Sequence, residues 1–309
     1  MDYVTGLPQI TYLEKPKLLY FADAFVRSIS CITPVQEGVM GLSGNGVLLA
    51  CIDSGVDYAH PDFCAPDGTS RIAILWDQTI PGNPPMGYAL GSVYTRQQIN
   101  EALASSTPEE RFALVPSRDV TGHGTAVLGI AAGNGRSSAD AAMRGVAPEA
   151  TLVVVKLGNP DPADLPRTSQ LLQAVDFCVR YALLVERPLV INLSFGNNYG
   201  SHSGDSLLET YLNAVSNLGQ NVICIGAGNE GDTGRHYAGN LKSDRKSSGQ
   251  TQTVRATSDP AATSAVSATA DRAVSVEFQV GAYESSFSLQ IWKVYGDEIS
   301  IELISPGGI

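Results

Sequence analysis

The 309-residue sequence has little positive charge and no long apolar run. Lys and Arg number 20 against 31 Asp and Glu, which gives a formal net charge of −11. Nucleic acids and anionic membranes attract basic protein faces, so this composition argues against both as partners. No apolar run approaches the roughly 20 residues that a membrane-spanning helix needs. The first residues also lack a basic segment followed by an apolar one, so no secretory signal is expected there.

Cysteine is scarce, and its spacing matches no known framework. The five cysteines are an odd number, lie far apart and form no Cys-x-x-Cys pair. This pattern argues against both a disulfide framework and a zinc ribbon. We therefore expect all five to be small buried apolar side chains, namely Cys31, Cys51, Cys64, Cys178 and Cys224.

Short apolar runs alternate with helical stretches from about residue 45 to 230, which is typical of a parallel sheet covered by helices. Several runs are apolar almost throughout, as expected of strands buried on both faces. The predicted strands are 46–52, 71–76, 151–157, 189–193 and 221–225. The predicted helices are 121–132, 169–184 and 206–218, the first with Thr121 as a candidate N-cap. The sequence therefore predicts an α/β fold.

The pattern changes to alternation with a period of two from about residue 251. Apolar residues alternate with polar ones over 274–280, 287–291 and 299–303, which predicts antiparallel strands. The stretch 256–270, rich in Ala, Ser and Thr, is interpreted as a linker leading to them. Three strands cannot close a sandwich or barrel and would leave an exposed edge, so we expect the natural polypeptide to continue past Ile309.

Three polar residues stand where catalytic groups are often placed. Asp53 directly follows a predicted strand, where functional groups gather in open α/β sheets, although a turn or capping aspartate fits equally well. His123 lies between two glycines at a predicted helix start, whose positive end favours the neutral ring of a general base. Asn229, in a Gly-x-Gly-Asn turn, suits either stabilisation of an oxyanion or a left-handed turn.

Taken in order, these segments resemble the subtilisin-like serine proteases. The motifs are Asp-x-Gly at 53–55, Gly-His-Gly-Thr at 122–125 and Gly-x-Gly-Asn at 226–229, and the order Asp, His, then Ser is that of the subtilisins. Three further segments fit the family, namely 57–63, Gly-Val-Ala-Pro at 145–148 and Asn-Leu-Ser-Phe-Gly at 192–196. The resemblance covers about residues 30–235 and implies a subtilisin-like fold.

The resemblance also implies a role for each matching residue. Asp53 would orient His123, His123 would move the proton of the nucleophile, and Asn229 would donate to the oxyanion. An extended polypeptide substrate would be held by Ser194, Phe195, Gly196 and Gly228. The implied reaction is acyl transfer to water and needs no cofactor. No metal site is expected, because the loop 133–142 does not match the family's calcium loop, although Asp62 aligns with a frequent ligand.

The family's nucleophile is missing, since no Gly-Thr-Ser-x-Ala follows Asn229. The letters Gly-Thr-Ser at 68–70 precede His123 and lie just before a strand, so they are interpreted as a turn. One explanation is a jelly-roll domain inserted before the serine, as in the Csp-type germination proteases of clostridia, which 75–79 and 287–306 resemble. The other is a pseudoprotease or regulatory module that binds peptides without cutting them. The unclosed β region favours the first explanation, and the resemblance then favours a spore or cytoplasmic location.

Three regions are predicted along the chain. Residues 1–20 form a propeptide remnant, because 9–15 resembles the last strand of a subtilase propeptide, although a surface strand of the mature enzyme also fits. Residues 21–250 form the catalytic domain without its serine segment, and 251–309 form a linker and the start of the inserted β domain. A dinucleotide-binding domain is excluded, because the glycine-rich stretch 41–46 precedes a strand instead of following one.

Overall fold

The fold is that of a computed structural model of the chain. The structure describes residues 27–159, 165–197, 199–229, 231, 236–238, 252–254, 264–266, 268–269, 273–274, 276–278, 280, 287–293 and 301–304. Contacts divide the chain into two units, Met1–Asn197 with Gly204–Gly226, and Asn198–Ser203 with Ala227–Ile309. Each unit is described by itself.

A six-stranded sheet forms the centre of the first unit, in the order β3-β2-β4-β1-β5-β6. Its strands are β1 (Leu48–Asp53), β2 (Ile72–Asp77), β3 (Ser92–Thr95), β4 (Thr151–Lys156), β5 (Leu189–Leu193) and β6 (Asn221–Ile225). All neighbours are parallel except β2 and β3. The predicted α/β class and the five predicted strands are confirmed. The antiparallel edge strand β3 was not predicted, because four residues without an apolar run give no periodic signal.

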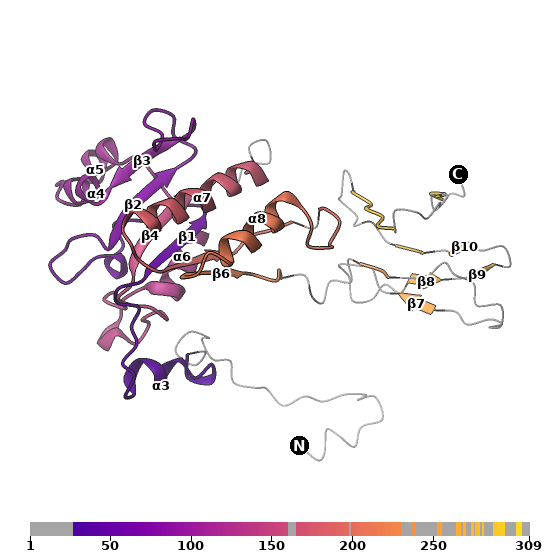
Figure 1. The fold of residues 1–309 in the computed structure, drawn as a ribbon, viewed down its shortest axis with the longest axis horizontal. Coiled ribbons are helices and arrows are strands. Elements are labelled where there is room, and N and C mark those ends of the chain that lie inside the picture. The colour runs from indigo at the N-terminus through magenta and orange to yellow at the C-terminus, as the bar shows by residue number, and fades with distance from the viewer. Residues whose placement is uncertain are drawn as a thin grey trace, which may run out of the picture. The chain divides into compact units, whose positions relative to one another are not determined.

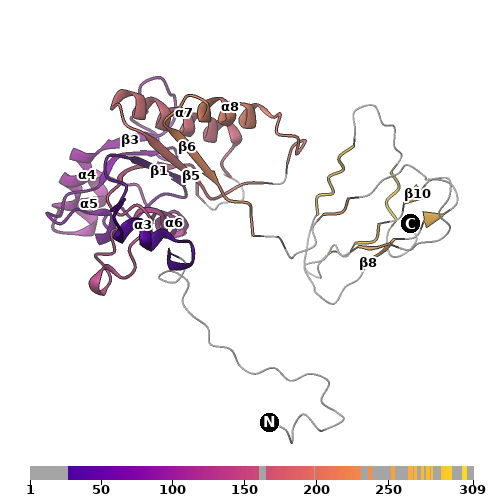
Figure 2. The same ribbon diagram turned by 60° about the horizontal axis from the view of Figure 1, so that its bottom comes forward.

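Helices cover both faces of this sheet (Figures 1 and 2). The helices α7 (Thr168–Leu184) and α8 (Leu207–Ser216) pack on one face, where β1 contributes Ala50 and Ile52. On the other face, α4 (Arg96–Leu103) and α6 (His123–Ala132) pack against Leu49 and Cys51 of the same strand. The central strand β1 is therefore buried on both sides, and its carboxyl end is fixed by two packed layers.

Short helices were harder to predict than long ones. The helix α5 (Pro108–Leu114), like α4, begins with a capping box, formed by Thr95 for α4 and Thr107 for α5. Both capping boxes are visible in the sequence as a threonine followed three residues later by Gln98 or Glu110. Further short elements in the described part of the first unit include α3 (Ile32–Glu37), η1 (Pro61–Phe63) and η2 (Ala139–Ala141).

A half-buried arginine holds together the ends of several elements of the first unit. The Arg71 guanidinium donates hydrogen bonds to the carbonyl oxygens of Asp62 (3.0 Å), Ala132 (2.7 Å) and Ala150 (2.9 Å). Burial lowers the pKa of Arg71 to about 10. Because Ala132 ends α6, Arg71 satisfies a carbonyl at the negative end of the helix that begins with His123.

The cysteine prediction is right for three residues and wrong for two. Cys51, Cys64 and Cys178 are buried, and burial raises the pKa of the Cys51 thiol. Cys31 and Cys224 are exposed, because Cys31 lies in a turn before α3 and Cys224 lies on the edge strand β6, which is largely exposed. None of these five thiols is in a disulfide.

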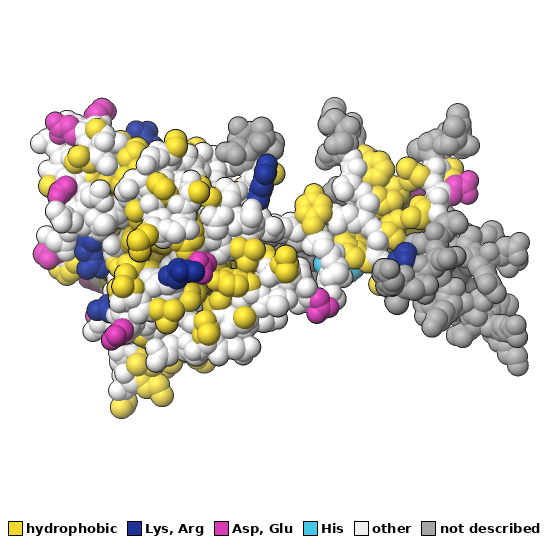
Figure 3. Space-filling model, turned by 45° about the horizontal axis from the view of Figure 1, so that its top comes forward, with side chains coloured by type: hydrophobic (Ala, Val, Ile, Leu, Met, Phe, Trp, Pro, Cys, Tyr) yellow, Lys and Arg dark blue, Asp and Glu magenta, His cyan; other side chains and the backbone are white. Residues whose placement is uncertain are grey.

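The surface bears mixed charge. On the face shown in Figure 3, acidic and basic side chains are interspersed among hydrophobic ones, and no extended basic patch is seen there. Among the helices in the described part of the chain, none is both long and apolar enough to cross a membrane.

In the second unit, the described residues form two short antiparallel pairs. The strand β7 (Gln252–Val254) pairs with β8 (Ser264–Val266), and β9 (Ala268–Thr269) pairs with β10 (Ala273–Val274). The strands β8 and β9 lie within 256–270, so the linker prediction is wrong for these residues, since Thr and Val also favour strands.

The alternating pattern farther along is matched in the described residues only at Val274, which ends β10. The stretches 276–278, 287–293 and 301–304 form no regular structure. The rest of the predicted runs, and the predicted propeptide remnant 1–20, lie outside the described residues. The inserted β domain and the three-region division stay predictions.

Candidate active site

The end of β1 and the start of α6 bring Asp53 and His123 together. The His123 Nδ1 atom lies 2.7 Å from the Asp53 Oδ1 atom. Asp53 is 5% exposed, whereas the His123 side chain is 53% exposed. A carboxylate in this place binds the Nδ1 proton, fixes the ring's orientation and leaves Nε2 free to accept a proton. The pair therefore has the geometry of an oriented general base.

The two oxygens of the Asp53 carboxylate differ in their hydrogen bonds. Its Oδ1 atom also accepts a hydrogen bond of 2.7 Å from the backbone N–H of Ser54. Its Oδ2 atom is buried and has no hydrogen-bond partner among the described residues. Buried carboxylate oxygens usually have partners, and a carboxylate with spare accepting capacity attracts a positive neighbour strongly in a medium of low dielectric constant. The described contacts of the Asp53 carboxylate therefore all fall on Oδ1, the oxygen that faces His123.

The two glycines beside His123 have different reasons, backbone conformation at Gly122 and close packing at Gly124. Gly122 is the N-cap of α6 with φ 75°, a left-handed conformation that other residues rarely adopt. A Cβ atom on Gly124 would overlap the carbonyl oxygen of Gly55 and lie 3.1 Å from the Cβ atom of Asp53. The prediction that Thr121 caps the helix is wrong by one residue, because the chain must turn through Gly122 to bring α6 against β1.

The carboxylate of Asp119 links the residue after β1 to the start of α6. The Asp119 Oδ1 atom accepts hydrogen bonds from the Ser54 hydroxyl (2.8 Å) and the Gly122 N–H (3.0 Å). Its Oδ2 atom accepts from the N–H (2.9 Å) and hydroxyl (2.6 Å) of Thr125. Burial opposes ionisation, yet these hydrogen bonds hold the pKa of Asp119 below its ordinary value. Sequence reasoning missed Asp119, although an aspartate four residues before the histidine was visible.

This lowered pKa predicts a pH-dependent loss of stability. A carboxylate with a depressed folded pKa stabilises the fold above the ordinary value of about 4, and this contribution is lost as the pH falls through the folded value. The variant Asp119→Asn should therefore have a lower urea midpoint than the wild type at pH 7, and the two midpoints should converge toward pH 3. A difference that is the same at both pH values would contradict this.

The other predicted site residues are distributed over both units. Ser194, Phe195 and Gly196 directly follow β5 in the first unit, and the Ser194 hydroxyl accepts a hydrogen bond of 2.8 Å from the Asn192 side chain. Gly196 is exposed. Gly228, with φ 95°, and Asn229 belong to the second unit, so they are described apart from the Asp53–His123 pair. The roles of all these residues stay predictions.

The letters Gly-Thr-Ser at 68–70 form part of a turn, as predicted. The Gly68 N–H donates to the Ala65 carbonyl, and the Asp67 carboxylate binds the Thr69 hydroxyl. Ser70 is buried.

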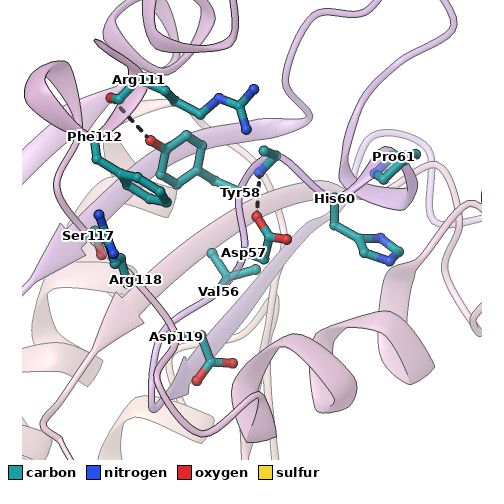
Figure 4. Close-up of a pocket in the computed structure, with 11 residues that line it drawn as sticks. Val56, Asp57, Tyr58, His60, Pro61, Arg111, Phe112, Ser117, Arg118 and Asp119 are labelled. Carbon is teal, nitrogen blue, oxygen red and sulfur yellow. Dashed lines mark hydrogen bonds between the residues drawn. The ribbon is translucent and has the colours of Figure 1, made fainter. Parts of the chain in front are cut away.

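A cavity of about 420 Å³ lies beside the loop that leads to His123 (Figure 4). One wall is formed by residues 56–61, which follow β1, and the other by Arg111, Phe112 and 117–119. The Arg118 guanidinium lies 3.7 Å from the centre of the Phe112 ring. The cavity thus adjoins Asp119 and is built partly by α5, an element that sequence reasoning missed.

No group of three or more His, Cys, Asp and Glu side chains among the described residues could hold a metal ion. The Asp62 carboxylate, which aligns with a frequent calcium ligand, accepts a hydrogen bond of 2.7 Å from the Ser137 N–H.

Comparison with known proteins shows the family to which the chain belongs. The model of the subtilase family matches residues 44–308. The chain belongs to the subtilase family. It is 26% identical to Subtilisin E of Bacillus subtilis over 228 residues, which are 74% of this chain and 46% of that protein. It is 29% identical to the major intracellular serine protease of Bacillus subtilis over 205 residues, 66% of this chain and 49% of that protein.

Among solved structures, this subtilase is similar to the CspB protease of Clostridium perfringens. The identity is 35% and the TM-score is 0.60, over 68% of this chain and 42% of that one. The subtilase and Csp-type resemblance predicted from the motifs is confirmed, as is the subtilisin-like sheet flanked by helices. The chain spans less than half the length of each of these proteins.

Proposed function

We propose that this protein is a serine endopeptidase that uses Asp53, His123 and a serine beyond residue 309. The observation that carries the proposal is the 2.7 Å contact between His123 Nδ1 and buried Asp53, with the imidazole exposed on its other side. A ring held in this way accepts a proton at Nε2 from an attacking hydroxyl.

The proposed reaction has two acyl-transfer steps. The serine oxygen attacks the substrate carbonyl while His123 takes its proton, and Asp53 stabilises the imidazolium that forms. The Asn229 amide donates a hydrogen bond to the oxyanion of the tetrahedral intermediate. His123 then gives its proton to the leaving amine, and water releases the acyl group by the same route in reverse. No step needs a cofactor.

The proposed substrate is an extended polypeptide. The exposed backbone around Gly196 continues directly from β5, so a substrate strand can add to it through main-chain hydrogen bonds. Gly228 would contribute to the same binding site. The chain's own propeptide, predicted to end in 1–20, is a candidate substrate of this kind.

A role in spore germination is proposed from the Csp-type similarity. It is supported by 35% identity to the CspB protease and by the motif Leu-Trp-Asp-Gln-Thr at 75–79. In such a role the peptidase would activate a cortex-lytic zymogen in the spore, and residues 251–309 would begin an inserted jelly-roll domain.

A second function is favoured by one specific observation. No Gly-Thr-Ser-x-Ala motif follows Asn229 within the 309 residues. A pseudoprotease, or a regulatory module that binds peptides without cutting them, would explain this directly.

The experiment that separates the two functions uses the full-length gene product. It is incubated with an unfolded protein substrate, and the products are identified by mass spectrometry. A peptidase gives new peptide termini whose number grows with time, and the His123→Ala variant gives none. A protein that retains the substrate on a column but yields no new termini would support the binding module and overturn the peptidase.

A further inference from the structure

Three buried charged side chains end neighbouring strands at the same level of the sheet. In register, Lys156 of β4 is paired with Asp53 of β1 on one side and with Asp77 of β2 on the other. Their exposures are 3%, 5% and 0%. Side chains in register on parallel strands point to the same face, and here it is the face that α6 covers. A buried lysine is therefore flanked in register by two buried aspartates.

Each of these strand ends holds a different part of the loop that leads to His123. The Asp77 Oδ2 atom accepts a hydrogen bond of 2.6 Å from the Ser117 hydroxyl. The Lys156 Nζ atom donates one of 2.5 Å to the backbone carbonyl of Arg118. Asp53 at the end of β1 contacts His123 itself. The order of the loop residues thus follows the order of the strands β2, β4 and β1 across the sheet.

Lys156 takes part in no ion pair of the described residues, and its ammonium is directed at a backbone carbonyl instead. Its aliphatic stem lies beneath the turn after β1, since a Cβ atom on Gly55 would be 3.1 Å from the Lys156 Cδ atom. A buried charge is costly unless it is compensated, and on strands about 4.8 Å apart the two aspartates in register are the acidic residues nearest along the sheet. A neutral side chain would pack here at lower cost, so the charge needs an explanation.

We propose that Lys156 is a positioning residue for the peptidase reaction, an inference that rests on the proposed function. Its ammonium fixes the 117–119 loop through the Arg118 carbonyl and balances the charges of Asp53 and Asp77. The loop in turn places Asp119 and the start of α6, so Lys156 keeps His123 against Asp53 without touching the imidazole. The ionisable groups around this point are Cys51, Asp53, Asp77, Arg118, Asp119 and His123.

The test compares Lys156→Met with Arg71→Met, which also removes a cation that donates to carbonyls but acts at the far end of α6. The readout is the low-field proton resonance of the His123 Nδ1–H···Asp53 hydrogen bond in this chain. Lys156→Met should lose the resonance, whereas Arg71→Met, folded at lower stability, should keep it. A resonance unchanged in Lys156→Met would overturn the proposal.

If Lys156→Met does not fold, Lys156→Arg and Lys156→Gln replace it. The arginine keeps the charge and should keep the resonance, while the neutral glutamine should lose it. Equal resonances in both variants would overturn the proposal.

Kinetics on the full-length protein provide a second readout. A displaced catalytic base costs about 100-fold in rate, so Lys156→Met should lower kcat by about that factor and leave KM within about twofold. If the wild type cleaves nothing while the resonance still depends on Lys156, the proposed function fails and the positioning role stands. If the wild type cleaves and Lys156→Met has an unchanged kcat, the positioning role fails alone.

Discussion

The variant Gly124→Ala should lose both stability and the contact between Asp53 and His123. The added Cβ atom would overlap the Gly55 carbonyl and press on the Asp53 side chain, and neither neighbour is the flexible end of a long side chain. Overpacking of this kind costs about 1–3 kcal/mol, and here α6 must move away from β1 to relieve it. Such a displacement of the base lowers kcat about 100-fold. Urea unfolding and peptide hydrolysis measure the two effects.

Gly129→Ala is the matched control, since Gly129 lies on the same helix and a Cβ atom there meets nothing within 4 Å. Alanine in a helix interior is more stable than glycine by about 1 kcal/mol, so this variant should be slightly stabilised and fully active. Equal urea midpoints for the two variants would show that the approach of α6 to β1 is not as close as described.

Asp53→Asn should have the largest effect on rate. The amide can keep a hydrogen bond to the His123 ring but donates as readily as it accepts, so it no longer selects the tautomer with Nε2 free, and it does not stabilise imidazolium. Replacing the aspartate of a Ser-His-Asp triad by asparagine lowers kcat by about 10⁴-fold. We expect a similar fall in kcat/KM of the full-length protein, measured on a peptide substrate at pH 7.

Asp176→Asn controls for the loss of a hydrogen-bonded carboxylate. Asp176 lies on α7, on the other face of the sheet, and accepts hydrogen bonds from Tyr88 (2.8 Å), Arg180 (2.7 Å) and Tyr211 (3.1 Å). Its removal should lower the urea midpoint and leave the rate unchanged. If Asp53→Asn also changed only the midpoint, Asp53 would be a structural residue and not part of a base.

The core of the fold was predictable because buried parallel strands have a strong local signal. The run that forms β5 is a nearly continuous apolar segment, and its predicted bounds match the structure. The missed elements β3, α4 and α5 are short. The helices α4 and α5 begin with capping boxes and pack on each other, and β3 pairs with β2. Their absence from the prediction also hid one wall of the cavity next to Asp119.

The sequence predicted which residues form the candidate site, but not which side chains hold them in place. Asp53 and His123 stand near Gly55 and Gly124, two glycines that close packing requires, and these glycines are visible in the sequence. No glycine pattern of this kind marks Lys156, because a lysine after four apolar residues is typical of an exposed strand end. Its burial becomes visible only once the register places it between Asp53 and Asp77.

The central claim is that Asp53 and His123 activate a serine. Treating the full-length protein with a fluorophosphonate, which labels activated serines, and mapping the adduct by mass spectrometry tests this most directly. The account predicts one labelled serine beyond residue 309 in the wild type and loss of the label in His123→Ala. An unlabelled wild type, or a label that survives His123→Ala at the same rate, would contradict it.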